Sequence, residues 1–542
     1  MAAITEPVML DSTGQRAAAA LETIAAQKTA PICTVTKVGK TATITTEDSV
    51  NGRKTATISD GEDGADGGAY LVHITDAADA GETVTLTNGT DTYTGTLSAV
   101  GTASITVTQP GTYTASVNGT EIGSVTIGTY SINKDKTVVF AFHYSENDSN
   151  PNSVTYPEGY DNSGFTDPFY MNLSTGVPHY GDWDPNGANA SILKWFYPKS
   201  CMVKYNGTRD YYLDENDETK KADGTASDVA NTSYSGNAMM EWGQDGKQIY
   251  WKIVPDADGK GFTFVVANGD NGDPDMKPWN HYNCKGQVAE HFYTPKYFGS
   301  DDGTRLRSIS GGTNYVNHAA SDELSKAKAN NQTSDEIWNT EVYADWVFLA
   351  MMEVLISKSM NTQEKFGYGR CASGNSSAIG QGTMNGKGMF WGSSDQTSGV
   401  KIFGMENTHG NLWRRIAGLI NDKGTVKIKL TYGKQDGSTV EGYNLDGSGY
   451  ISHGSISGTS GGYTSHMNIS DRGISPNTIS GSDSTYYTDG AWFNNSQVDY
   501  ALVGGGWAGS LLVGAFCCTL NVAVSVASTY AGAALSCKPL AA

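Results

Sequence analysis

The C-terminal stretch Gly504–Leu535 reads GGGWAGSLLVGAFCCTLNVAVSVASTYAGAAL. It follows neither the period of two of a half-buried strand nor the period of 3.6 of an amphipathic helix. A skeleton nevertheless stands out in it: Gly504, Gly505, Trp507, Gly514, Ala515, Phe516, Leu520, Ser525, Gly532, Ala533 and Leu535. Across Ala508–Ala534 there is no Lys, Glu, Gln, Met or Trp. A codon with randomised first and second bases and a pyrimidine third base cannot encode any of these five residue types.

This skeleton with its restricted filling resembles the variable region of diversity-generating retroelement target proteins, in which error-prone reverse transcription rewrites adenines of asparagine codons. Asn521 alone keeps the asparagine that dominates unmutated templates. The resemblance implies that these positions vary and bind a ligand: Gly506, Ala508, Gly509, Ser510, Leu511, Leu512, Val513, Cys517, Cys518, Asn521, Val522, Val524, Val526, Ser528, Tyr530 and Ala534. Two alternatives stay open. The stretch is a core hairpin whose composition arose by chance, or some of its apolar side chains belong to the core.

A second segment, GMENTHGNLWRRIAG at Gly404–Gly418, is similar to the G-x-E-N-x-x-G-N-x-W-x-x-x-x-G segment of the formylglycine-generating-enzyme type of C-type lectin fold. Its glycines permit tight turns, Asn407 and Asn411 can hydrogen-bond loop backbone, and Trp413 is expected to fill the core. GNAMMEW and IYWKI, at Gly236–Trp242 and Ile249–Ile253, resemble segments of phage tail adhesins of this fold. The resemblance implies these scaffold residues: Trp507, Phe516, Leu520, Glu406, Asn407 and Trp413.

Bulk composition restricts the function classes. A chain of 542 residues is expected to hold several domains, and its 65 Gly and 29 Tyr favour a β-rich, loop-rich protein. A net charge of −20 argues against nucleic acid or an anionic membrane as partner. The apolar run at Trp346–Ile356 is too short to span a bilayer. MAAITEPVMLDSTGQR has no basic or apolar signal-peptide region, so synthesis in a bacterial cytoplasm is expected.

The fold class expected is α+β, with a C-terminal C-type-lectin-like domain. Asp11–Lys28 predicts a helix, Lys37–Ser59 a threonine-rich hairpin, and Gly61–Gly67 carries a glycine every third residue, like either a trimeric tail-fibre neck or a flexible linker. Alternation between Tyr70 and Ile127 predicts about six strands. The expected domains are an attachment helix (1–30), a hairpin and GxxG neck (31–68), an immunoglobulin-like sandwich spacer (69–131) and the receptor-binding domain (132–542).

One long helix is expected in the last domain, at Asp335–Ser359. There Ile337, Val342, Trp346 and Leu349 begin a stripe at helical spacing. The other segments of this domain predict short strands and loops, with many Asn-Gly and Asp-Gly turns.

Catalysis is the rival to binding. The enzymatic relatives of this fold bind copper through a thiolate pair, which Cys517, Cys518 and Cys537 could mimic, yet adjacent cysteines on a strand point to opposite faces. No HxxxH or CxxC spacing occurs, so no metal site is expected. Asp256–Gly261 and Asp270–Asp275 resemble calcium-loop fragments, but each lacks the final Glu and favours Asx turns. Calcium is possible but unsupported, and no cofactor or catalytic residue is predicted.

The sequence thus predicts a non-enzymatic, homotrimeric adhesin at the host-facing tip of a phage tail. Its expected partners are a host cell-surface receptor, protein or glycan, a tail or baseplate protein at the N-terminus, and copies of itself. Neither nucleic acid nor membrane insertion is expected. The alternatives are a variable lectin-like protein displayed on a bacterial surface and an oxidase of the formylglycine-generating type.

Overall fold

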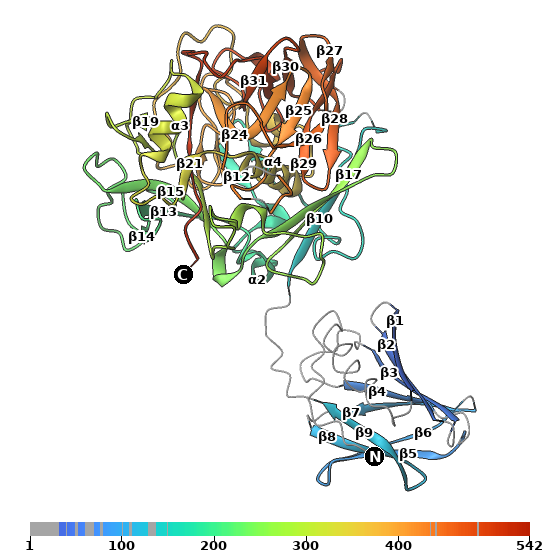
Figure 1. Cartoon of the computed structure of the whole chain (residues 1–542). Coiled ribbons are helices and arrows are strands. Elements are labelled where there is room, and N and C mark those ends of the chain that lie inside the picture. Colours follow the sequence, from blue (N-terminus) through green and yellow to red (C-terminus); the bar gives the residue numbers. More distant parts are fainter. Residues whose placement is uncertain are drawn as a thin grey trace. The chain divides into compact units, whose positions relative to one another are not determined.

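The chain, described by a computed structural model, forms two compact units, Met1–Lys136 and Thr137–Ala542 (Figure 1). The structure describes residues 32–38, 41–48, 52–59, 70–75, 80–99, 101–107, 111–127, 137–148, 150–433, 435–438, 442–484 and 487–541. The expected helix at Asp11–Lys28 and the glycine run at Gly61–Gly67 lie outside these residues. Within them, no helix combines the length and apolar character needed to cross a membrane.

The first unit consists of two antiparallel sheets. One has the order β1 (Ile32–Val38), β2 (Thr41–Asp48), β3 (Gly52–Ser59), β4 (Tyr70–Thr75) and β7 (Thr102–Val107). The other has the order β6 (Thr92–Thr96), β5 (Thr83–Thr87), β8 (Gly111–Val117) and β9 (Thr120–Ile127). The six strands expected between Tyr70 and Ile127 are therefore confirmed, with ends shifted by a few residues.

One apolar core joins the two sheets of this unit. Strand β7 alternates exposed and buried residues, which turns Ile105 and Val107 inward. They share a cluster with Val84 and Leu86 of β5, in the other sheet. The expected hairpin is present as β2 and β3, but β3 also pairs with β4, so the expected segments 31–68 and 69–131 contribute to one sheet.

The second unit is built on three larger sheets. A ten-stranded sheet contains β26 (Ile451–Ser455), β25 (Thr425–Ile428), β24 (Trp413–Asp422), β31 (Val498–Val503), β32 (Cys518–Leu520), β30 (Gly490–Phe493), β28 (Gly461–Ser470), β29 (Gly473–Ile479) and β27 (Ser457–Gly458), with β33 (Ala531–Ala533) against β24. A six-stranded sheet has the order β14 (Arg209–Tyr212), β13 (Lys199–Lys204), β15 (Gly236–Trp242), β18 (Phe292–Pro295), β34 (Leu535–Cys537) and β21 (Trp338–Thr340). A three-stranded sheet has the order β10 (Val139–Ser145), β17 (Gly261–Ala267) and β16 (Tyr250–Pro255).

Short elements complete the second unit. Three two-stranded ribbons are β11 (Tyr170–Asn172) with β12 (Val177–His179), β19 (Ser300–Asp301) with β20 (Leu306–Arg307), and β22 (Lys401–Ile402) with β23 (Met405–Glu406). The described helices are α2 (Ala190–Leu193), α3 (Ala320–Lys328), α4 (Tyr343–Ser357) and α5 (Thr362–Phe366), with 3₁₀ turns η2 (Gly181–Trp183), η3 (Gln244–Gly246), η4 (Trp279–His281) and η5 (Ser510–Leu512). The fold is mostly β, so the expected α+β class gives helices too large a share.

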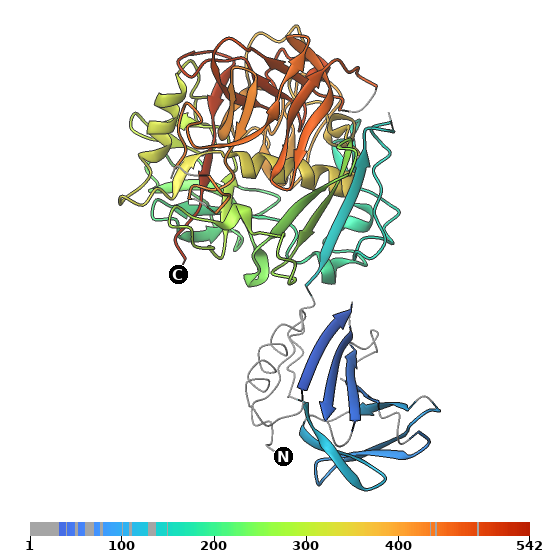
Figure 2. The same ribbon diagram turned by 45° about the vertical axis from the view of Figure 1, so that its right-hand side comes forward.

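The central helix α4 is shorter than expected. Asp335–Val342 does not continue it, because Trp338–Thr340 forms β21 and pairs with β34 at the C-terminus. Every residue of α4 is buried, Asp345 and Glu353 included. Helix α4 contacts β24 and β29 on one side and β10 on the other. Figure 2 shows it between the orange-red strands and the green and teal strands. A helix that is buried on all sides needs no amphipathic stripe, so the spacing of apolar residues did not indicate where the helix begins.

Candidate functional site

Two loops connect the last strands of the ten-stranded sheet. The first loop, Gly504–Cys517, joins β31 to β32, and the second loop, Asn521–Tyr530, joins β32 to β33. Together they contain nearly all the positions expected to vary. Gly504 and Gly505 open the first loop with φ of 83° and 85°, a backbone conformation that side chains rarely adopt. These two skeleton glycines therefore fix how the first loop leaves the sheet.

Side chains of other elements hold the main chain of the first loop. Gln363 of α5 donates through Nε2 to the carbonyl oxygens of Leu511, at 2.9 Å, and Val513. The carboxylate of Asp489, just before β30, accepts the backbone N–H of Phe516 at 2.6 Å. The loop's path is therefore set by groups that do not change when its own side chains change.

Two further contacts complete this support. Ala515 donates its N–H to Thr362 Oγ1 at 3.2 Å and accepts at its carbonyl oxygen from Trp346 Nε1 at 2.9 Å. Nearer the start of the loop, Asn375 donates to the carbonyl oxygen of Trp507 at 2.9 Å. Side chains of helix α4, of helix α5 and of the Asn375 loop thus all hydrogen-bond the backbone of the first loop.

The second loop is held in the same way. Five donors outside it reach its carbonyl groups: Tyr500 N to Val522 O at 3.0 Å, Ala320 N to Val524 O at 3.0 Å, Arg415 Nη2 to Val526 O at 3.3 Å, Asn317 N to Ser528 O at 2.9 Å and Trp413 N to Tyr530 O at 2.9 Å. Arg415 is itself buried and paired with Glu323 at 2.7 Å. Side chains on this loop can therefore change without removing the bonds that shape it.

The two loops line a hollow of about 410 Å³. Eight of its lining residues are positions expected to vary: Gly506, Ala508, Gly509, Asn521, Val522, Val526, Ser528 and Tyr530. Trp413, Trp492, Leu502, Thr519 and Ala531 line it as well. The structure therefore brings half of the expected variable positions together around one cavity.

Aromatic rings shape this hollow. Trp413 and Trp492 meet edge to face, with ring centroids 5.7 Å apart and planes at 85°. Trp507 stacks on Tyr530 at 4.5 Å and 14°. The expectation that Trp413 and Trp507 are buried scaffold is therefore wrong: both are only half-buried. Trp413 begins β24 and lines the hollow, which leaves part of its ring open to it.

Five positions expected to vary and bind a ligand are buried: Gly506, Val513, Cys517, Cys518 and Ala534. A Cβ on Gly506 would lie 3.0 Å from the Trp413 ring, so the site tolerates a larger residue poorly. Val513 packs over Gly505, while Cys518 in β32 belongs to the main core. Ala534 sits between β33 and β34, where its carbonyl accepts from Glu341 at 2.8 Å. For these five residues the structure favours the alternative that part of the stretch belongs to the core.

The remaining expected positions behave differently. Ser510, Leu511, Asn521, Val526 and Tyr530 are exposed. Ala508, Gly509, Leu512, Val522, Val524 and Ser528 are half-buried. Phe516 and Leu520 are fully buried, as the skeleton predicts. The exposed and half-buried set is what we call the variable face.

Polar residues of the Gly404–Gly418 motif hydrogen-bond loop backbone, as their residue types allow, with the exception of Asn407. Glu406 is buried and accepts the N–H groups of Gly382 at 2.8 Å and Met384 at 2.9 Å. Asn411 accepts the Ile379 N–H at 2.8 Å, as predicted. Asn407 differs, because neither its side-chain oxygen nor its nitrogen has a partner. Its φ of 57° places it in the left-handed region, where asparagine is favoured for backbone reasons.

Sequence reasoning missed Trp492, Leu502, Thr519 and Ala531. Trp492 lies in β30, outside any motif, and no local pattern could have associated it with Trp413. Leu502 is the penultimate residue of β31, two residues before Gly504. Its closeness to the glycine-rich start of the first loop was the one signal in the sequence that could have associated it with the loops.

The cysteines named in the rival hypothesis, Cys517, Cys518 and Cys537, are all buried. Cys517 and Cys518 are fully buried, and burial raises the pKa of both thiols well above the usual range. Cys518 lies in the ten-stranded sheet and Cys537 in the six-stranded sheet. Among the residues that the structure describes, no group of three His, Cys, Asp or Glu side chains could hold a metal ion.

The acidic loops form Asx turns, as predicted. Asp258 Oδ1 accepts the Lys260 N–H at 2.9 Å, and Asp270 Oδ1 accepts the Gly272 N–H at 2.8 Å. These carboxylates therefore have local backbone partners.

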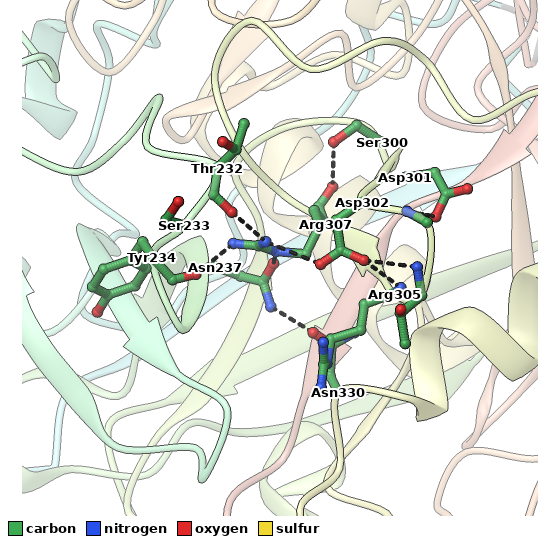
Figure 3. Close-up of polar contacts among 12 residues, drawn as sticks. Thr232, Ser233, Tyr234, Asn237, Ser300, Asp301, Asp302, Arg305, Arg307 and Asn330 are labelled. Carbon is green, nitrogen blue, oxygen red and sulfur yellow. Dashed lines mark hydrogen bonds and ion pairs between the residues drawn. The ribbon is translucent and has the colours of Figure 1, made fainter.

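A polar cluster around Arg307 has a structural explanation (Figure 3). Its guanidinium is buried and donates to five protein groups: Thr232 O, Tyr234 O, Gly236 O, Asn237 Oδ1 and Asp302 Oδ2, at 2.7 to 3.3 Å. Asn237 in turn donates to Asn330 at 3.1 Å. With its donors engaged by protein, Arg307 ties the 232–237 segment to β20 and offers nothing to a ligand.

No protein-family model and no curated protein matches the chain. Among solved structures, it is similar to one described as "Major Tropism Determinant P3c Variant". The two share 12% identity over 91% of this chain and 93% of that chain, with a TM-score of 0.22.

Proposed function

We propose that this protein is a receptor-binding protein of a phage tail tip that recognises a host-surface molecule through the variable face. One observation carries the proposal: the main chain of both loops is fixed by groups outside them, while their own side chains line a hollow. Such an arrangement separates shape from specificity, because a rigid scaffold presents side chains that can be exchanged.

Retroelement-driven diversification and a C-type-lectin-like fold are part of this proposal. They are supported by the codon-restricted filling of Ala508–Ala534 and by the Gly404–Gly418 motif. The exposed or half-buried positions are the ones whose exchange costs little stability. For the five buried positions, the same codon argument predicts variation, but only small residues would be accepted there.

The proposed role is non-catalytic and uses no cofactor. Host contact through one hollow per chain would be weak by itself. Several copies per virion would raise the overall affinity through effective concentration. The proposed attachment to a tail or baseplate protein and the proposed trimer belong to the N-terminal segment, so the variable face is left for the host.

The test uses the full chain, labelled with a fluorophore, on a panel of bacterial cells measured by flow cytometry. A variant carrying Ala508→Asn, Val526→Asn, Ser528→Asn and Tyr530→Asn should keep its melting temperature and lose or change the strains it binds. A matched variant with four Asn substitutions in the first unit, at Thr83, Thr92, Thr96 and Thr102, should bind like the wild type. All four of these threonines are exposed strand residues. If the variant of the variable face still binds the original strains, the proposed function is wrong.

A further inference from the structure

The hollow has two parts of different origin. One part, which we call the floor, includes Trp413, Trp492 and Leu502, which come from β24, β30 and β31 and lie outside the expected variable positions. The other part, which we call the rim, consists of residues of the two loops that are expected to vary. If the loops diversify as proposed above, the floor would stay the same in every variant. A constant floor under a changing rim suggests a contact that all variants share.

The hollow is uncharged although the chain is strongly acidic. None of its thirteen lining residues carries a charge, whereas the whole chain has a net charge of −20. A charged group placed in such a site would lose water without finding a partner, which costs several kcal/mol. The occupant that complements these walls is therefore a neutral one.

Two polar groups of the hollow have partners within its own lining. Thr519 Oγ1 donates to Asn521 Oδ1 at 2.6 Å, and Ser528 Oγ accepts the Tyr530 N–H at 3.2 Å. An apolar group needs no such partners and gains from contact with the aromatic rings.

Exposed apolar side chains gather near this hollow. Of the seven large hydrophobic side chains exposed in the described residues, three lie on the two loops: Leu511, Val526 and Tyr530, at 41%, 42% and 43%. Val526 and Tyr530 line the hollow itself. Exposed apolar groups concentrated around a cavity are typical of a protein-binding surface.

We propose that the floor of Trp413, Trp492 and Leu502 is a constant anchor pocket for an aromatic or aliphatic side chain of a receptor protein. This rests on the proposed function and makes it more specific, because it assigns the receptor to the proteins. A buried apolar anchor at the centre of an interface supplies most of the binding energy, and the rim around it excludes water and selects the partner. A volume of about 410 Å³ accommodates one such side chain with its neighbours.

The first experiment probes the pocket directly in the full chain. Saturation-transfer NMR is recorded with N-acetylphenylalaninamide and N-acetylleucinamide, and separately with glucose, galactose and N-acetylglucosamine. The two amides should receive saturation and the three sugars should not. Ala508→Glu, which puts a charge into the lining, should lower the amide signal at least about tenfold. Ala80→Glu, the same change at an exposed turn residue of the first unit, should leave it unchanged.

Three results would overturn the pocket: transfer to sugars alone, an equal amide signal in Ala508→Glu, or no transfer to any probe. If Ala508→Glu does not fold, Ser528→Glu on the second loop takes its place, with circular dichroism confirming the fold. A second experiment separates this inference from the proposed function. Cells that bind the full chain are treated with proteinase K or with periodate. Binding lost only after proteinase supports the anchor, whereas binding lost only after periodate overturns it and leaves receptor binding intact. If no cells bind, the proposed function fails by itself.

Discussion

At the scale of residues, the stretch Gly504–Leu535 mixes two kinds of side chain. Phe516 and Leu520 are fully buried in the main core, whereas Val526 and Tyr530 are exposed on the variable face. Burial decides what a substitution costs, because a deleted core side chain leaves a cavity and a deleted surface side chain does not. Stability and recognition should therefore respond to different residues of the same loops.

We predict that Phe516→Ala and Leu520→Ala each lower the free energy of unfolding by about 2–5 kcal/mol, as core cavities do. Val526→Asn and Tyr530→Asn should change it by no more than about 0.5 kcal/mol each, as surface substitutions do. Urea denaturation followed by tryptophan fluorescence measures all four variants. An unfolding free energy equally low for Tyr530→Asn would mean that the second loop is core.

The residue scale also shows where sequence reasoning stops. Phe516 and Leu520 were predictable as buried because they belong to the apolar skeleton. Cys517 and Cys518 were expected among the variable, ligand-binding positions because of the codon restriction, which holds no information on which way a side chain points. Trp413 was expected in the core because a tryptophan in a glycine-rich motif usually packs inside. A tryptophan that lines a cavity also keeps much of its apolar surface away from water.

At the scale of elements, helix α5 and the first loop form one unit. Gln363 supplies the side-chain donor for the carbonyl groups of Leu511 and Val513. We predict that Gln363→Leu leaves both carbonyls without this partner and costs about 1–3 kcal/mol. Amide hydrogen exchange should become faster in the first loop and unchanged in the second loop, which α5 does not hold. Equal exchange in both loops would contradict the assigned role of Gln363.

Two buried acids beneath the first loop should make stability depend on pH. Burial raises the pKa of Asp489 to about 8, and burial with the neighbouring Asp489 charge raises that of Glu353 to about 8. The ordinary values are about 4. Between these limits the folded state keeps protons that the unfolded state has lost. The stability is therefore fully present below about pH 4 and is lost as the pH rises through about 8.

We predict that the part of the unfolding free energy that comes from Asp489 falls from about pH 5 to about pH 8, seen in urea as the difference between the wild type and Asp489→Asn. Asp489→Asn keeps a carbonyl oxygen for the Phe516 N–H and cannot ionise, so it should flatten this fall. Asp258→Asn, on an exposed Asx turn, is the matched control and should leave the slope as it is in the wild type. A pH profile identical in Asp489→Asn and the wild type would show that Asp489 does not titrate in this window.

Elements were predictable to different degrees for a physical reason. The strands between Tyr70 and Ile127 show clear alternation because one face of each sheet is solvated. Helix α4 shows no such contrast, since it is buried on all sides. Its predicted start was eight residues too early, because Asp335–Val342 forms strand and loop. The segment before α4 is not helical because β21 pairs with β34, a contact with the distant C-terminus.

At the scale of the whole molecule, the hollow depends on contacts that no local pattern contains. Trp413 and Trp492 are far apart in the chain and meet only because β24 and β30 belong to one sheet. The sequence therefore predicted the loops and not the floor beneath them. The residues expected to join copies of the chain lie in 11–68, mostly outside the described residues. Assembly therefore stays a prediction from the sequence.

We predict that the full chain is a trimer and that residues 137–542 alone are a monomer. The second unit has its own extensive core, so it should fold without the first unit. In the sequence, Ala17, Leu21 and Ile24 fall at helical spacing within the predicted helix at Asp11–Lys28, and so thin an apolar stripe predicts a helix that needs copies of itself. Light scattering after gel filtration, at micromolar concentration, measures the mass of both proteins. Leu21→Asp with Ile24→Asp should convert the full chain to a monomer with an unchanged melting transition of the second unit. A monomeric full chain would refute the trimer, and a trimeric 137–542 fragment would transfer the contact to the unit that carries the variable face.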